Sequence, residues 1–161
     1  MPTTPTSRRP ALVSLAACLG VTFLAPLAGA WTPPSAWYAG LAKPSFTPPG
    51  WLFGPAWTVL YVLMAVGAWM VWRQAGPGRR ARPLALYGVQ LALNAAWTPV
   101  VFGAHQLGWG LVTIVAMWLA IALTIRAFWQ VRPLAGALLL PYLAWVTFAT
   151  TLNAALWRLN G

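Results

Sequence analysis

Five apolar stretches, each long enough to cross a bilayer, constrain this 161-residue chain more than any other feature. The hydrocarbon core of a bilayer is about 30 Å thick, and a helix needs about 20 apolar residues to cross it. Stretches of about this length cover residues 11–30, 50–72, 84–103, 108–129 and 134–157. They leave no room for a soluble domain. The sequence therefore predicts an all-α membrane protein whose single domain, residues 1–161, is a five-transmembrane-helix bundle.

The composition excludes several classes of function. Sixty per cent of the residues are hydrophobic and 6% are charged, whereas a soluble domain carries about 25% charged residues. The net charge of +10 would suit nucleic acid, but the cations lie in short loops between apolar runs, so we expect no nucleic-acid partner. There is no Asp or Glu, one Cys and one His. We therefore expect no metal site, no carboxylate proton relay and no conventional catalytic motif.

The distribution of cations predicts the orientation of a multi-pass membrane protein. Cytoplasmic loops carry an excess of Lys and Arg. Two cations, Lys43 and Arg158, fall on one side of the predicted spans. The other eight fall on the side of the N-terminus: Arg8, Arg9, Arg73, Arg79, Arg80, Arg82, Arg126 and Arg132. We therefore expect a cytoplasmic N-terminus and a C-terminus on the opposite side.

The first apolar stretch has a second interpretation. Ser7-Arg8-Arg9, an apolar run and Ala28-Gly29-Ala30 together resemble a signal peptide with its cleavage site. The stretch is long for the apolar region of a signal peptide, and four helices would leave one flank of the bundle open. We expect the first helix to be retained.

Aromatic and polar residues recur at helical spacing inside three of the predicted spans. Such stripes either lock helices together or line a cavity, because polar groups at membrane depth face the bundle interior. We favour a ligand pocket, because three stripes converge under one long loop, residues 31–49. The stripes comprise Trp57, Tyr61 and Met64 in the second span, Gln90, Asn94 and Trp97 in the third, and Trp145, Ala149 and Leu152, with Phe148 alongside, in the fifth.

A stripe of small residues, Gly88, Ala92 and Ala96, follows the opposite face of the third span. Small residues let two helix backbones approach closely. The stripe serves either a contact within the bundle or a homodimer interface, and we expect a dimer.

Three long motifs resemble the tryptophan-rich sensory protein/translocator protein family, also called the peripheral benzodiazepine receptors. They are KPSFTPPGWLFGPAWTVLY from residue 43, QLALNAAWTPVVFG from residue 90 and PYLAWVTFATTLNAALWRLN from residue 141. The resemblance implies a five-helix membrane bundle, often dimeric, that binds porphyrins such as protoporphyrin IX and haem. Animal members also bind cholesterol and benzodiazepine-type drugs. Bacterial members are linked to tetrapyrrole regulation, and some are proposed to degrade protoporphyrin in light.

The resemblance also implies site residues. The family's photochemical tryptophans match Trp57 and Trp145, which we take as candidate catalytic residues. This chain has Phe46 where family members often have Trp, and its C-terminal segment lacks the Tyr of the family's cholesterol motif. Carried over position by position, the ligand pocket falls on Trp57, Tyr61, Asn94, Trp97, Trp145, Phe148, Ala149 and Leu152.

The loop 31–49, which we call the lid, is then expected to cover this pocket. Its prolines stiffen it, so that it loses little entropy on ordering. Phe46 and Trp51 are expected to roof the pocket above Trp57, with Lys43 the nearest cation for porphyrin propionates. The expected function is a porphyrin-binding sensor or regulator that requires no cofactor. The alternatives are a light-dependent porphyrin-degrading enzyme and a transporter of porphyrin or sterol-like ligands.

Overall fold

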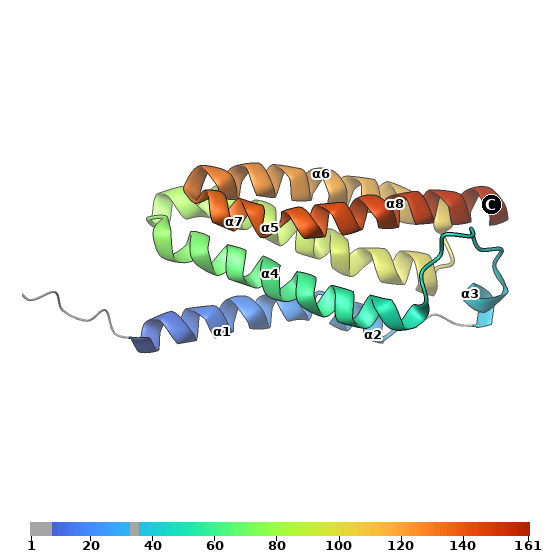
Figure 1. Cartoon of the computed structure of the whole chain (residues 1–161), viewed down its shortest axis with the longest axis horizontal. Coiled ribbons are helices and arrows are strands. Elements are labelled where there is room, and N and C mark those ends of the chain that lie inside the picture. Colours follow the sequence, from blue (N-terminus) through green and yellow to red (C-terminus); the bar gives the residue numbers. More distant parts are fainter. Residues whose placement is uncertain (1–7, 33–35) are drawn as a thin grey trace, which may run out of the picture.

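The computed structural model describes residues 8–32 and 36–161, and this part of the chain is built from helices (Figure 1). Short helices or turns flank most of the long ones. In chain order the helices are α1 (Arg8–Leu24), α2 (Leu27–Ala30), α3 (Ala36–Gly40), a 3₁₀ turn (Gly50–Leu52), α4 (Phe53–Gln74), α5 (Pro77–Thr98), a π-helical turn (Pro99–Gly103), α6 (Leu107–Val131), α7 (Pro133–Ala137) and α8 (Leu140–Asn160).

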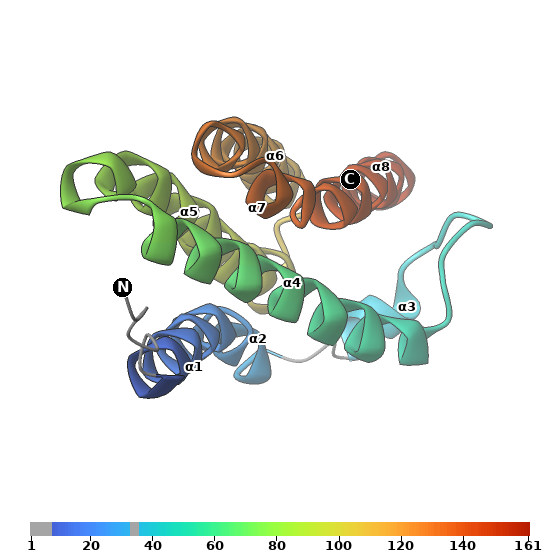
Figure 2. The same ribbon diagram turned by 60° about the vertical axis from the view of Figure 1, so that its left-hand side comes forward.

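The long helices run side by side in an up-and-down bundle (Figures 1 and 2). Helix α5 packs against α6, α6 against α8, and α1 against α4. In the described part of the chain, four helical segments are long and apolar enough to cross a membrane: Gly50–Gln74, Pro77–Gly103, Leu107–Val131 and Pro133–Asn160. A shorter apolar helix, Pro10–Leu24, lies beside them. The structure is therefore that of a membrane helical bundle.

Proline divides two helices that the sequence led us to expect as continuous. The helix expected over 11–30 is divided into α1 and α2 by a turn at Ala25 and Pro26, where the Ala25 amide donates to the Thr22 carbonyl at 3.3 Å. Proline has no N–H to continue the helix and pushes the preceding residue away from helical geometry. The helix expected over 134–157 is likewise divided into α7 and α8 by a turn after Ala137. Pro141, the second residue of α8, follows this turn.

Helix α5 begins earlier than expected. We placed Arg79, Arg80 and Arg82 in a loop, but α5 starts at Pro77 and includes all three arginines. Proline is favoured at the first position of a helix, and arginine is a good helix former. At its other end α5 passes into a π-helical turn, in which the Ala104 amide donates to the Pro99 carbonyl at 2.8 Å.

Polar side chains connect α1 to the rest of the bundle. The hydroxyls of Thr22 and Tyr87 lie 2.6 Å apart and share a hydrogen bond between α1 and α5. The indole N–H of Trp69 on α4 is 3.1 Å from both the Ala11 carbonyl and the Ser14 hydroxyl. In an apolar environment such bonds are expensive to leave unmade, so they fix α1 against α4 and α5.

At Gly67, α4 packs tightly against Ala135 of α7 and Leu139, which precedes α8. A Cβ atom at this position would lie 2.8 Å from Cδ1 of Leu139 and 3.0 Å from the carbonyl oxygen of Ala135. Gly67 is therefore required by packing. Gly54, on the same helix, has no heavy atom within 4 Å of the equivalent position.

We predict that Gly67→Ala destabilises the protein by about 1–3 kcal/mol, because overpacking forces the two helices apart. Gly54→Ala is the matched control. It adds the same methyl group to α4 in open space and gains about 1 kcal/mol or less of helix propensity. Thermal unfolding in detergent, followed by circular dichroism, tests both. Equal melting temperatures for the two variants would contradict the close approach of α4 and α7.

Candidate ligand-binding site

A cavity of about 580 Å³ lies between α4, α5, α6 and α8 at the end of the bundle that carries the lid. Cavities that bind small molecules measure about 300–1,000 Å³. Besides the helices, Ala25 and Pro26 of the α1–α2 turn and Tyr38, Lys43, Thr47 and Pro48 of the lid contribute to its lining. The cavity is therefore lined by four long helices, the α1–α2 turn and the lid.

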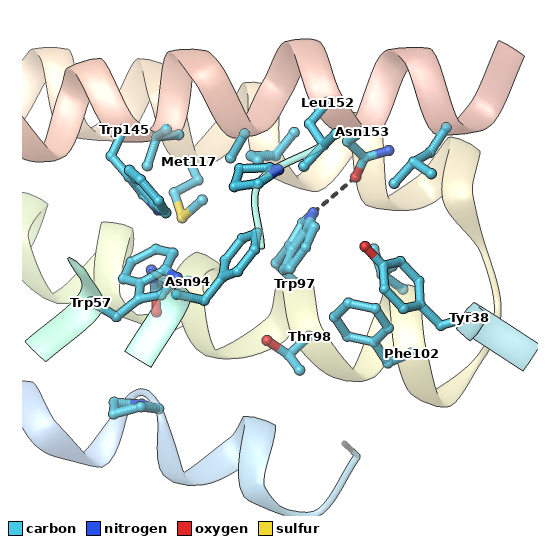
Figure 3. A pocket seen from close by; sticks show the side chains of 18 of the residues that line it. Tyr38, Trp57, Asn94, Trp97, Thr98, Phe102, Met117, Trp145, Leu152 and Asn153 are labelled. Carbon is cyan, nitrogen blue, oxygen red and sulfur yellow. Dashed lines mark hydrogen bonds between the residues drawn. The ribbon is translucent and has the colours of Figure 1, made fainter. Parts of the chain in front are cut away.

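Aromatic rings form the walls of the cavity. Trp57 of α4, Trp97 of α5 and Trp145 of α8 extend into the same region from three helices (Figure 3). The rings of Trp57 and Trp145 lie 6.5 Å apart, centroid to centroid, at 81°. Trp57 is also stacked on Tyr61, with centroids 5.3 Å apart. Further lining rings belong to Tyr38, Phe53 and Phe102.

Asn94 forms the centre of a hydrogen-bond network below these rings. Its Oδ1 accepts from the Tyr61 hydroxyl at 2.7 Å, and its Nδ2 donates to the Tyr142 hydroxyl at 3.1 Å. Tyr142 in turn donates to the sulfur of Met117 at 3.5 Å. The network joins α4, α5, α8 and α6, so Asn94 both lines the cavity and locks the helices together.

A second network positions Trp97. Its indole N–H donates to Oδ1 of Asn153 at 3.1 Å, and Nδ2 of Asn153 donates to the Leu107 carbonyl at 2.9 Å (Figure 3). Asn153 is almost completely buried. The ring of Trp97 is thus fixed between α5 and α8 before any ligand arrives.

Three side chains have buried polar atoms without a hydrogen-bond partner among the described residues: Thr32, Gln90 and Trp145. The ring of Trp145 lines the cavity, although its Nε1 has no acceptor there. Both amide atoms of Gln90 lack a partner, and Gln90 is fully buried outside the cavity lining. The stripe of the third span therefore divides, with Asn94 and Trp97 on the cavity and Gln90 in the core.

Several contacts attach the lid to the bundle. The side-chain amide of Asn160, at the end of α8, accepts from the Ala42 amide at 2.8 Å and donates to the Ala42 carbonyl at 2.9 Å. Trp37 stacks on His105 with centroids 4.2 Å apart. Residues 33–35 of the lid lie outside the described part of the chain. The remainder covers the cavity end of the bundle.

Lys43 is the cation in the cavity lining. Its ammonium group donates to the carbonyls of Ala39 and Leu41 at 3.0 and 3.2 Å and lies 4.9 Å from the centroid of the Tyr38 ring. A tyrosine phenol is neutral at physiological pH, and partial burial raises the pKa of Tyr38 further. The charge of Lys43 therefore faces no anionic side chain.

Most of the candidate ligand residues meet at this cavity, but three do not line it. The expected roof residues Trp51, which is 73% exposed, and Phe46, which is 49% exposed, are both absent from the cavity lining, and so is Phe148. Phe148 contacts Phe46 edge to face, with centroids 6.4 Å apart. Met64, from the same stripe as Trp57, is fully buried in the core. The seven that line the cavity are Trp57, Tyr61, Asn94, Trp97, Trp145, Ala149 and Leu152.

Sequence reasoning also missed residues of the site. Phe53 lies four residues before Trp57, and Asn153 lies four residues after Ala149, so extending the helical stripes would have found both. Tyr38 and Phe102 lie in segments without helical periodicity in the sequence. Their placement depends on how the lid and the π-helical turn pack, including the edge-to-face contact between them at 5.1 Å.

Comparison with known proteins identifies the family. Residues 14–158 match the model of the TspO/MBR family. The human translocator protein is 52% identical over 126 residues, which cover 77% of this chain and 75% of the relative. Protein CrtK of Rhodobacter capsulatus is 44% identical over 89% of this chain and 87% of its own length. The tryptophan-rich sensory protein of Cereibacter sphaeroides is 46% identical over 82% of each chain. With its membrane-length helices, this chain is an integral membrane protein that belongs to the TspO/MBR family.

Proposed function

We propose that the protein is a membrane sensor or regulator that binds a tetrapyrrole, such as protoporphyrin IX or haem, in its aromatic cavity. The observation that carries this proposal is the set of rings from α4, α5 and α8 around a cavity of about 580 Å³. A porphyrin is flat, apolar and aromatic, and aromatic walls favour such a ligand by stacking and edge contacts. The name of one relative, tryptophan-rich sensory protein, agrees with a sensing role.

The polar groups of the cavity suit the same ligand. A porphyrin carries propionate groups, which need cations or water, and Lys43 lies in the cavity lining at the lid. The side-chain amides of the two asparagines already form hydrogen bonds within the protein. Asn94 bonds to Tyr61 and Tyr142. Asn153 bonds to Trp97 and the Leu107 carbonyl. We therefore assign the macrocycle to the rings and the propionates to Lys43.

A second candidate function is light- and oxygen-dependent porphyrin breakdown. The adjacent indoles of Trp57 and Trp145 favour it, because two easily oxidised rings 6.5 Å apart both line the cavity. In this scheme light excites the bound porphyrin, molecular oxygen is the oxidant, and the two tryptophans are the catalytic residues. Transport of porphyrin or sterol-like ligands is a further alternative, but the sequence contains no intramembrane carboxylate for proton coupling.

We also propose that α1 and α2 form a fifth span. Helix α1 has 17 residues, or about 26 Å at 1.5 Å per residue, and α2 continues it beyond Pro26. The hydrogen bonds of Thr22 and Trp69 support its place in the bundle. Five spans and the distribution of arginines together favour a cytoplasmic N-terminus.

The small-residue stripe supports a homodimer. Gly88, Ala92 and Ala96 are all exposed on α5, and a Cβ atom added at Gly88 would have no heavy atom within 4 Å. In the described structure the stripe is not used within the bundle. We propose that it packs against a second copy of the chain.

For the orientation, we predict that a reporter fused to the C-terminus is active only if it works outside the cytoplasm. An alkaline phosphatase fusion should therefore be active and a green fluorescent protein fusion dark. The opposite pattern would contradict an odd number of spans with a cytoplasmic N-terminus.

For the assembly, we predict that Ala92→Leu yields monomers that still bind porphyrin. The larger side chain separates the two backbones, whereas the cavity lies on the other face of α5. Light scattering in detergent gives the mass, and Ala144→Leu, the same change at an exposed position of α8 outside the cavity lining, is the control. An unchanged dimer in the Ala92 variant would assign the stripe to lipid.

For the site, we predict that Trp145→Phe keeps porphyrin binding and loses most of the photoproduct. The variant retains an aromatic ring but removes the easily oxidised indole, whose N–H has no acceptor among the described residues. Its dark affinity should fall by on the order of 1 kcal/mol, about fivefold in Kd. Absorbance titration in the dark and a time course under illumination are measured on the same sample.

Trp109→Phe provides the matched control, because Trp109 is exposed on α6 outside the cavity lining. It should leave both measurements unchanged. An unchanged photoproduct yield in the Trp145 variant would exclude a catalytic role for this indole and leave it a wall of the cavity. A failure of unaltered protein to bind any porphyrin would overturn the proposed function itself.

A further inference from the structure

Six arginines gather at the end of the bundle opposite the lid, although they come from four segments of the chain. They are Arg73 in the last turn of α4, Arg79, Arg80 and Arg82 near the start of α5, Arg126 near the end of α6, and Arg132 just before α7. In Figure 1 these helix ends lie together on the left, away from the C-terminus. All six side chains are exposed or half-exposed. We call this surface the arginine end.

The chain supplies no negative side chain that could neutralise the arginine end. It contains no Asp or Glu, and its C-terminus lies at the other end of the bundle (Figure 1). Three of the arginines lie near the start of α5, where the helix dipole is also positive. Their counter-charge must therefore come from outside the chain.

Two tryptophans hold arginines close to the membrane surface. The guanidinium carbon of Arg80 lies 3.9 Å from the centroid of the Trp72 ring, and Arg80 donates to the Trp72 carbonyl at 3.5 Å. Arg73 lies 5.3 Å from the centroid of Trp69. Trp72 is exposed at the end of α4, and exposed tryptophans at the ends of spans lie at the level of the lipid headgroups. The guanidinium groups therefore lie at the depth of the lipid phosphates.

We propose that the arginine end binds the phosphate groups of anionic phospholipids. Guanidinium binds phosphate through two parallel hydrogen bonds, and clusters of cations at the ends of spans attract anionic lipids. An acidic soluble protein would need cations that project into water, whereas the contacts with Trp72 and Trp69 hold Arg80 and Arg73 at the interface. The proposal concerns a surface far from the cavity and does not depend on what the cavity binds.

Spin-labelled lipids test the proposal on the full-length protein in phosphatidylcholine vesicles. Electron spin resonance gives the association of labelled phosphatidylglycerol with the protein relative to labelled phosphatidylcholine. One arginine near the surface favours an anionic lipid by about fivefold, and most of the lipid shell lies elsewhere. We therefore expect an average selectivity of about two- to threefold for phosphatidylglycerol, which falls in 1 M salt because salt screens the charges. Equal association of both lipids would overturn the proposal.

Three variants assign the selectivity to the arginine end. The triple variant Arg79→Gln, Arg80→Gln and Arg82→Gln should lower it clearly but not abolish it, because Arg73, Arg126 and Arg132 remain. Replacing the same three residues by Lys should retain most of it, because the charge remains. Arg158→Gln, which removes a cation at the lid end, should leave it unchanged. Unchanged selectivity in the Gln triple variant would contradict the assignment to the arginine end.

Two further additions separate lipid from other anions. Millimolar inorganic phosphate should not displace the labelled phosphatidylglycerol, because a free ion lacks the lipid's anchoring chains. Displacement by phosphate would show a site for small anions and would contradict the proposal. Capture of soluble polyglutamate by a protein without lipid selectivity would assign the surface to an acidic polypeptide and would also contradict it.

Discussion

The hydrogen bonds of Asn94 are the interaction on which the architecture of this protein depends. Inside a bilayer, polar groups have no water to bind and must find partners within the protein. Asn94 provides them for Tyr61 on α4 and Tyr142 on α8, and Tyr142 reaches Met117 on α6. One side chain of α5 thus fixes the relative positions of four helices. Those positions determine which rings face the cavity.

A membrane bundle with an open cavity gives up part of its packing energy, since a void deprives its lining of contacts. The structure offsets this loss on either side of the cavity. Towards the arginine end, Met64, Ile121, Phe128 and Leu139 are fully buried. Towards the lid, Val101, Leu107, Leu152 and Leu156 form a second apolar cluster, against which Tyr38 and Leu41 of the lid pack. The cavity therefore lies between the packed core and this second cluster, whose four residues also line it.

The sequence predicted those parts of the structure that follow from local rules. Apolar length located the four membrane-length helices, and helical spacing located Trp57, Asn94, Trp97 and Trp145 on the faces that meet. Sequence reasoning failed where contacts between distant segments determine how a side chain packs. Trp51 belongs to the aromatic motif before α4, yet nothing local shows that its ring lies outside the cavity, 73% exposed. Gln90 shares the helical stripe of Asn94 and Trp97, but the packing of α5 buries it in the core.

Helix ends were a second source of error. Charged residues usually end a membrane span, so the sequence predicts a loop at the arginines after Pro77. Arginine also favours helix, and α5 extends through them. The lid contacts of Asn160 and His105 could not be foreseen at all. Asn160 lies 118 residues from its partner Ala42, and His105 depends on a left-handed backbone with φ of 58°, a conformation for which histidine is enriched among non-glycine residues.

The most direct measurement of the central claim, that a tetrapyrrole occupies the aromatic cavity, is a dark absorbance titration of protoporphyrin IX into two variants of α8. Ala149→Phe places a ring inside the cavity, which Ala149 lines, whereas Ala144→Phe places the same ring on an exposed face of the same helix. Occupation of the cavity predicts that Ala149→Phe weakens binding about tenfold or more, or 1.4 kcal/mol, and that Ala144→Phe binds like the unaltered protein. Equal affinities for the two variants would contradict the claim and place the porphyrin elsewhere on the molecule.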